Sequence, residues 1–262
     1  MNQLISQSRT FALLLAAATS AFGAAPLHEP GAMVREGTWA DGAGMYYVPE
    51  ALEKLTPSKW PLEGWSRLSI ESNHIRSEPV LVPKGKMPAF LNSIVRQREA
   101  MQSDSTSNSV SPSEVTATEN ATREFYLRVP GTRLRSGAIP VHVFRNGTPA
   151  LRPQLDYRYA LKLNSQAFAF TVRNGLRGKH GEAYGEGAQY TIEYDGKTYL
   201  YSLGQFGWDS TIAAIADMDG DGKPDFVIYV GGNNSGYEAV LLSSKAKPGR
   251  NVATASLTQG GC

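Results

Sequence analysis

The chain has almost no cysteine. Its 262 residues contain a single one, Cys262, at the last position. Disulfides within the chain are therefore excluded, and with them a small disulfide-stapled fold. The thiol of Cys262 either stays free or pairs with a second chain. At this length we expect one or two domains, each with a proper hydrophobic core.

Long apolar runs are also missing. The most apolar stretch, residues 10–20, is too short to span a bilayer and follows a polar segment with one positive charge, Arg9. This pattern predicts a secretory signal peptide over residues 1–23, with the mature chain beginning at Ala24 or Pro26. No second stretch is long enough for a membrane span. We therefore expect an exported protein, periplasmic or extracellular, and the lack of disulfides favours a bacterial one.

Neither sign of charge is in excess. The chain has 26 Lys and Arg against 24 Asp and Glu, and loss of the signal peptide would remove one basic residue and no acid. Nucleic acids and anionic lipids are bound through concentrated Lys and Arg. Neither is expected as the main partner, which leaves an unidentified protein or glycan ligand at a surface.

Motifs for catalysis are lacking too. The sequence contains no nucleophile elbow, no zinc-binding histidine pair and no phosphate loop, and its histidines share no spacing. One basic, glycine-rich segment, residues 175–181, is interpreted as a flexible hairpin loop. Its alternative interpretation is an anion site formed by backbone amides with Arg177, Lys179 and His180.

Aromatic and acidic side chains offer a second possible site. Trp208-Asp209 would lie at the rim of a pocket, and Asp209 with Glu238 would supply the paired acids of a glycoside hydrolase. The simpler interpretation is that Trp208 packs and Asp209 caps a turn. Three other tryptophans are expected to pack in a small irregular subdomain rather than to form a sugar-stacking platform: Trp39, Trp60 and Trp65.

The composition divides the chain into regions. Residues 24–102 are predicted to be a small mixed α/β region with one helix from about Pro88 to Met101, where apolar residues recur at helical spacing. Residues 103–122 are rich in Ser and Thr, with too few apolar side chains to offset the entropy of ordering, and predict a flexible linker. Residues 123–262 are predicted to be an antiparallel β domain.

Short runs of β-branched and aromatic residues predict the strands of this domain. The clearest unit is a hairpin with a two-residue turn at Asp195-Gly196, which places large apolar side chains on one face. Its predicted pairs are Tyr194 with Lys197, Ile192 with Tyr199, and Tyr190 with Tyr201. Other strands are predicted at residues 125–129, 139–144, 157–163 and 167–172. The pattern favours a mainly β fold, an antiparallel sandwich or partly closed barrel, with a β-propeller-like fold as the alternative.

An acidic stretch between two apolar runs, residues 217–225, is the most informative part of the chain. Carboxylates occupy its first, third, fifth and ninth positions, glycine the sixth, and the seventh would offer a backbone carbonyl, as in a calcium loop. These residues are Asp217, Asp219, Asp221, Asp225, Gly222 and Lys223. Such crowded carboxylates repel each other unless a divalent cation holds them. The alternative is an acidic surface turn without an ion. An EF-hand is excluded, because the twelfth position is Ile228 and the flanks predict strands.

The same stretch resembles the D-x-D-G-D-G-x-x-D signature of FG-GAP and VCBS repeats, the calcium loops of integrin α-chain type, over residues 212–230. The resemblance implies that Asp217, Asp219, Asp221 and Asp225 bind Ca²⁺ between two antiparallel strands. It also implies a calcium-stabilised extracellular binding or adhesion fold, often a β-propeller with several copies of the repeat. This sequence contains one copy, which argues against a propeller.

These observations favour an exported, calcium-binding β protein that acts as a binding or structural module at the cell surface or in the periplasm. A secreted hydrolase that acts on glycans, with a structural calcium ion beside its cleft, is the alternative. The first hypothesis is preferred because the sequence has a well-filled metal motif and no catalytic constellation.

Overall fold

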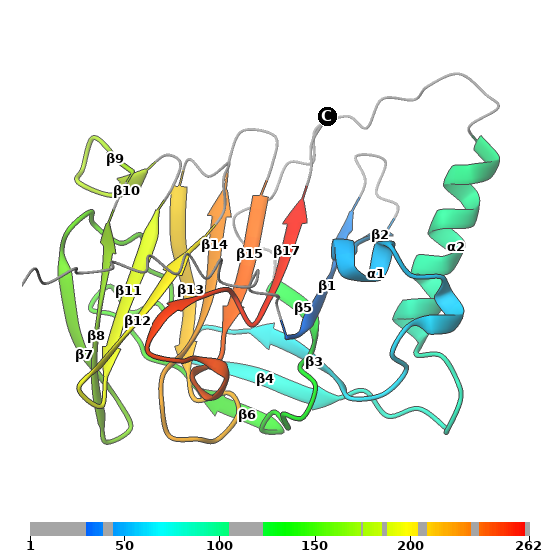
Figure 1. Cartoon of the computed structure of the whole chain (residues 1–262), viewed down its shortest axis with the longest axis horizontal. Coiled ribbons are helices and arrows are strands. Elements are labelled where there is room, and N and C mark those ends of the chain that lie inside the picture. The colour runs from blue at the N-terminus through cyan, green and yellow to red at the C-terminus, as the bar shows by residue number, and fades with distance from the viewer. Residues whose placement is uncertain are drawn as a thin grey trace, which may run out of the picture.

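The computed structural model describes residues 30–38, 44–104, 123–173, 175–184, 188–203, 209–231 and 236–259. The predicted signal peptide, most of the predicted linker, Trp39, Trp208 and Cys262 lie outside these residues. Within them the protein is mainly β, as predicted, with three sheets stacked in layers and one long helix (Figure 1). None of the sheets formed by the described strands closes into a barrel, so the sandwich prediction is confirmed.

The first layer, called the N-terminal sheet here, has the strand order β2-β1-β5-β3-β4-β6. Its strands are β1 (Ala32–Thr38), β2 (Gly44–Tyr47), β3 (Trp65–Ile70), β4 (His74–Pro79), β5 (Arg123–Arg128) and β6 (Gly137–Pro140). β5 follows the predicted linker in sequence, yet it lies between β1 and β3 and pairs with both. Strands from the two sides of the predicted linker therefore share one sheet.

The other two layers come from the region predicted to be β. The central sheet has the order β17-β15-β14-β13-β10-β9 and the outer sheet the order β16-β12-β11-β8-β7. The central strands are β9 (Leu176–Arg177), β10 (Ala183–Tyr184), β13 (Asp209–Ala216), β14 (Asp225–Gly231), β15 (Gly236–Leu241) and β17 (Ala255–Gln259). The outer strands are β7 (Arg158–Leu163), β8 (Gln166–Arg173), β11 (Gln189–Tyr194), β12 (Lys197–Ser202) and β16 (Gly249–Asn251). Among the described strands of these two sheets, β12 pairs with β16 in parallel and the other strand pairs are antiparallel.

The central sheet is buried on both faces. Along β14, Phe226 and Ile228 point into the core shared with the outer sheet, whereas Val227 points into the core shared with the N-terminal sheet. Successive side chains of a strand point to opposite faces, so a strand in a middle layer needs apolar residues at every position. The uninterrupted apolar run of β14 therefore follows from its place between two cores.

The third core lies between the N-terminal sheet and the helices. α2 (Ala89–Asp104) is the helix predicted after Pro88, and it buries Phe90, Leu91 and Ile94. The expected packing of the tryptophans is confirmed for Trp60 and Trp65, which are buried in the same core. Their indole N–H groups donate to main-chain oxygens, Trp60 to Leu52 at 2.9 Å and Trp65 to Pro61 at 2.8 Å. Two short elements precede β3: α1 (Glu50–Glu53) and η1 (Pro57–Lys59).

The hairpin of β11 and β12 has the predicted register. Tyr194 pairs with Lys197, and the large aromatic side chains of both strands are buried on one face. Asp195 and Gly196 form the turn with φ values of 51° and 67°. Positive φ at both central residues matches the right-handed twist of the strands, which explains the choice of Asp-Gly.

The strand predicted at residues 139–144 is regular only at its start. β6 ends at Pro140, and Val141 instead bridges to Ala216 of β13. The next amide, that of His142, donates to the Ile215 carbonyl oxygen at 2.8 Å. Here the chain leaves the N-terminal sheet and contacts the central sheet, so its hydrogen bonds are divided between the two layers. This crossing brings it next to the start of the acidic loop.

Candidate metal centre

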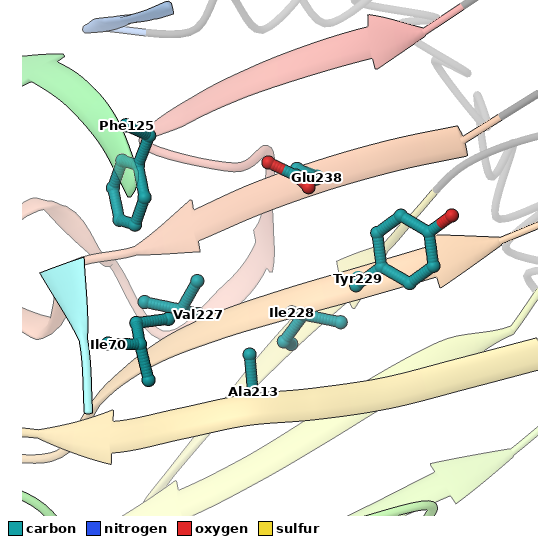
Figure 2. A pocket seen from close by; sticks show the side chains of 7 residues that line it. All are labelled: Ile70, Phe125, Ala213, Val227, Ile228, Tyr229 and Glu238. Atoms are coloured by element: carbon teal, nitrogen blue, oxygen red, sulfur yellow. The ribbon is translucent and has the colours of Figure 1, made fainter. Parts of the chain in front are cut away.

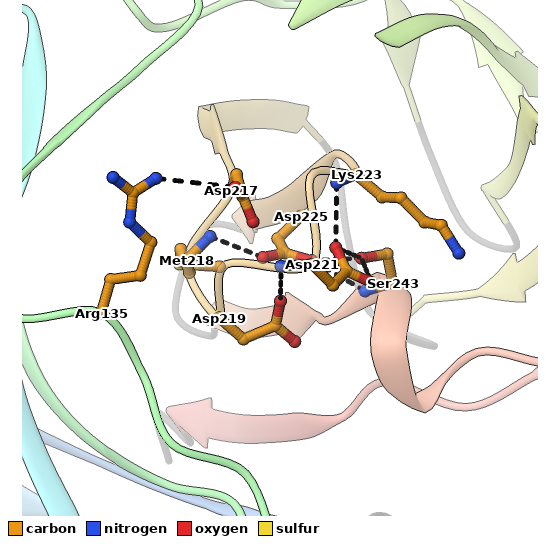
Figure 3. Close-up of polar contacts among 8 residues, drawn as sticks. All are labelled: Arg135, Asp217, Met218, Asp219, Asp221, Lys223, Asp225 and Ser243. Atoms are coloured by element: carbon orange, nitrogen blue, oxygen red, sulfur yellow. Dashed lines mark hydrogen bonds and ion pairs between the residues drawn. The ribbon is translucent and has the colours of Figure 1, made fainter. Parts of the chain in front are cut away.

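The acidic loop connects β13 to β14, which pair with each other as antiparallel strands. Its tight course depends on glycine. Gly220 and Gly222 both have φ of +81°, in the left-handed region that residues with a Cβ rarely adopt. Gly222 is the residue for which the sequence predicted a sharp turn. These two residues curl the loop, and the carboxylates of Asp217, Asp219 and Asp225 approach one another within it (Figure 3).

Three carboxylates meet inside the loop. One oxygen each from Asp217, Asp219 and Asp225 lie within 4.8 Å of one another. Asp217 and Asp225 are buried, and Asp219 is half-buried. Carboxylate oxygens at this spacing are ligands that a hard divalent cation prefers. The structure therefore groups three of the predicted metal-binding residues in an arrangement that could hold a metal ion.

Asp217 contributes a buried oxygen that lacks a hydrogen-bond partner among the described residues. Its side chain is only 8% exposed, and this oxygen is its Oδ1 atom. The other oxygen, Oδ2, lies 3.5 Å from Nη1 of Arg135 (Figure 3). An unsatisfied buried polar atom costs about 1–3 kcal/mol, more when the group is charged. A cation bound between the carboxylates would satisfy this oxygen.

Asp225 organises the loop from its buried end. Its Oδ2 atom accepts a hydrogen bond from the Met218 amide at 2.7 Å, and its Oδ1 atom accepts one from the Ser243 amide at 2.8 Å. Burial raises the pKa of Asp225 well above its usual range, and the nearby negative charge of Asp219 raises it further. The carboxylate is thus held in place by amides, while no cation among the described residues offsets its charge.

Burial likewise raises the pKa of Asp219, to which the neighbouring carboxylates of Asp221 and Asp217 add. The Asp219 carboxylate also accepts hydrogen bonds, from the Asp221 amide at 3.3 Å and from the Ser244 hydroxyl. The common cause of both raised pKa values is negative charge gathered in a poorly solvated place. A bound divalent cation would reverse this effect and favour the ionised carboxylates.

The other two predicted site residues lie differently. The Asp221 carboxylate accepts hydrogen bonds from the Lys223 amide at 2.9 Å and contacts the Ser243 hydroxyl at 3.0 Å. The Lys223 ammonium points outward, 3.7 Å from Asp195 Oδ2 in the hairpin turn. Roles for Asp221 and for the Lys223 carbonyl in metal binding stay predictions.

Sequence reasoning missed three residues that contact the loop from elsewhere in the chain. Arg135 comes from the segment between β5 and β6, and its amide donates to the Met218 carbonyl oxygen at 2.8 Å. Ser243 and Ser244 belong to η2 (Ser243–Lys245), which follows β15. No local signal marks them as partners of the loop, because each is brought there by the tertiary fold.

The remaining sequence candidates do not form comparable sites in the described part of the chain. In the glycine-rich loop, the backbone N–H of His180 donates to the Glu182 carboxylate at 2.8 Å and that of Gly178 to the Glu182 carbonyl oxygen at 2.9 Å. The Glu182 carboxylate thus occupies a backbone amide of this loop, and the segment is a plain hairpin loop. His142, one of the scattered histidines, lies outside this loop; it is half-buried, and burial lowers its pKa.

Glu238, the proposed acid of a glycan hydrolase, is buried and forms an ion pair with Arg35. It lines a small cavity between the central and N-terminal sheets, together with Tyr229, Phe125 and apolar side chains (Figure 2). The cavity volume is about 10 Å³, which is room for about one water molecule. A sugar ring does not fit there.

Comparisons of the chain with protein-family models, with curated proteins and with solved structures found no match. Among the described helices, none has the length and apolar character needed to cross a membrane.

Proposed function

We propose that this chain is an exported β-sandwich protein stabilised by a calcium ion in the 217–225 loop, and that it acts as a binding or structural module outside the cytoplasm. The buried, unpartnered Oδ1 atom of Asp217, which lies beside the carboxylates of Asp219 and Asp225, carries the proposal. A protein gains nothing from gathering such charges in its interior unless a cation compensates them.

Calcium is favoured over other cations by the chemistry of the ligands. All candidate ligands are oxygens, and the described residues around the loop contribute no thiolate or imidazole. Ca²⁺ accepts six to eight oxygen ligands in flexible geometry, whereas Mg²⁺ demands a near-ideal octahedron and keeps several waters. The resemblance to FG-GAP and VCBS loops supports the same ion.

The proposed role of the ion is structural. The loop lies where the central sheet, the β5–β6 connection and η2 meet, so an ion there would tie three segments together. Extracellular calcium modules bind with dissociation constants of about 10⁻⁴ to 10⁻³ M. At a free concentration one hundred times the dissociation constant, one bound ion stabilises the folded state by about 2.7 kcal/mol.

Isothermal titration of the metal-free protein with Ca²⁺ and with Mg²⁺ tests the proposal. We expect one Ca²⁺ per chain, weaker Mg²⁺ binding, and no binding by Asp219→Asn. Asp156→Asn is the matched control, because Asp156 is an exposed acid far from the loop in sequence. Wild-type protein that binds no Ca²⁺ would leave the loop as an acidic turn. Export is tested separately by sequencing the N-terminus of the secreted product, which should begin at residue 24 or 26.

A further inference from the structure

The hydroxyl of Ser243 lies among carboxylate oxygens. Its Oγ atom is 3.0 Å from each oxygen of Asp221 and 2.9 Å from Oδ1 of Asp225 (Figure 3). Ser243 is 18 residues away from Asp225 in sequence and belongs to η2 rather than to the acidic loop.

The single proton of the Ser243 hydroxyl cannot form hydrogen bonds to all three of these carboxylate oxygens. A serine hydroxyl donates one hydrogen bond and accepts with two lone pairs. At most one of its three carboxylate contacts is therefore a full hydrogen bond. The remaining close oxygen–oxygen contacts are repulsive unless a positive charge lies between the atoms. Oxygens bound to one Ca²⁺ at about 2.4 Å lie about 3 Å from their neighbours, which is the spacing seen here.

The backbone fixes the position of Ser243. Its own amide donates to Asp225 Oδ1 at 2.8 Å, and the preceding amide, that of Leu242, donates to Thr254 Oγ1 at 2.8 Å. Its carbonyl oxygen accepts from the Tyr194 hydroxyl at 3.4 Å. Ser243 is buried, so its hydroxyl is held toward the loop without the freedom of a surface side chain.

We propose that Ser243 Oγ is itself a ligand of the bound ion, so that η2 contributes a neutral oxygen to a site otherwise built from the loop. This inference rests on the proposed function, because it requires that the loop binds a cation. It extends the ligand set beyond the acidic motif. It also makes the β15–β16 connection part of the calcium centre.

Terbium luminescence tests the assignment. Tb³⁺ replaces Ca²⁺ at oxygen sites, and Tyr194, whose hydroxyl contacts the Ser243 carbonyl oxygen, is placed to sensitise it. Luminescence lifetimes in H₂O and D₂O count the waters on the ion. In Ser243→Ala we expect one additional bound water and a Ca²⁺ affinity about tenfold weaker. Ser243→Thr keeps the hydroxyl and should keep the wild-type water count.

A ligand role and a merely supporting role give different results. If Ser243 only braces the carboxylates, Ser243→Ala weakens binding without changing the water count, and the assignment is overturned. Ser210→Ala is the matched control, since Ser210 is another buried hydroxyl, at the opposite end of β13, where it contacts Tyr190. Ser210→Ala should change neither the number of waters bound to the ion nor the Ca²⁺ affinity.

A nearly isosteric variant keeps the test valid if Ser243→Ala does not fold. In Ser243→Cys a soft sulfur replaces the hard oxygen, so the relative affinity of the site should shift from Ca²⁺ toward Zn²⁺. The wild type is the reference, because both proteins contain Cys262. An unchanged preference would contradict direct ligation. If wild-type protein binds neither Tb³⁺ nor Ca²⁺, the proposed function itself fails; a wild-type site with no response to Ser243 overturns this inference alone.

Discussion

Replacing Asp217 by Asn should change stability in opposite directions with and without calcium. The change keeps the size of the side chain and removes its charge. In EDTA, the buried Oδ1 atom of wild-type Asp217 has no hydrogen-bond partner among the described residues, and its charge adds to those of Asp219 and Asp225. The amide of Asn can donate to these carboxylates instead, which is worth about 1 kcal/mol.

In EDTA, the stability that Asp217→Asn loses is small. Asp217→Asn removes the ion pair with Arg135, but the Arg135 side chain is 45% exposed and the atoms are 3.5 Å apart. Ion pairs at such exposure contribute about 0–1 kcal/mol. We therefore expect the metal-free variant to be as stable as the wild type, or up to about 1 kcal/mol more stable.

With calcium at one hundred times the dissociation constant, the proposed site should stabilise the wild type by about 2.7 kcal/mol. The variant should lose most of this gain, because its site has one charge fewer and an amide nitrogen turned toward the other carboxylates. In calcium the wild type should then be more stable than the variant by about 2 kcal/mol, which reverses the order of stability expected in EDTA. In a thermal melt, the calcium gain of the wild type corresponds to about 5–10 °C.

Urea unfolding followed by circular dichroism, in EDTA and in graded Ca²⁺, measures both differences. Asp156→Asn is the control: the substitution is the same, Asp156 has φ of 62°, which Asn tolerates, and its side chain is 60% exposed. It should change stability by less than about 0.5 kcal/mol in either condition. An Asp217→Asn protein that is destabilised equally in EDTA and in calcium would refute the reasoning, since Asp217 would then act only as a structural acid.

Three further predictions follow from the loop and the cores. The pKa values of Asp219 and Asp225 are raised in the folded state. The free energy of unfolding of the metal-free protein should therefore fall as pH rises from about 4 toward those raised pKa values. Saturating Ca²⁺ should abolish this fall, as measured by urea titrations at each pH. Phe226→Ala should cost about 3–5 kcal/mol by the same assay, because Phe226 is fully buried between the outer and central sheets, whereas Leu81→Ala, at 86% exposure, should cost less than about 0.5 kcal/mol. Gly222→Ala should cost about 1–2 kcal/mol even in EDTA, because the position has φ of +81° and open space around it, so that only backbone strain opposes the methyl group.

Local patterns predicted several elements well. The Asp195-Gly196 turn and the alternation of large side chains determined the register of its hairpin, because both act between residues that are neighbours in sequence or directly opposite each other. The apolar flank after the acidic stretch was likewise predicted to be a strand, and it forms β14, which lies between two cores.

Predictions that depended on distant contacts were less complete. The strand expected at residues 139–144 is interrupted because Val141 bridges to Ala216 and the His142 amide donates to the Ile215 carbonyl oxygen, both in β13, although the Val141 amide itself still donates to Asn73 beside β4. β5 joins a sheet whose other strands lie largely before the predicted linker. Composition marks where the chain changes character, but strand pairing across such a segment depends on side chains far apart in sequence.

For the candidate metal centre, the sequence alone determined the number and spacing of the carboxylates and the need for glycine at Gly222, since both follow from chemistry within one short loop. The tertiary structure decided what surrounds them. It buried Asp217 beside Arg135, and it placed Ser243 against Asp221. These neighbours come from separate segments, and only packing of the layers brings them to the loop. Burial then makes the gathered charges costly, because the same charges would be solvated at the surface, and it gives the cluster a form that could hold a metal ion.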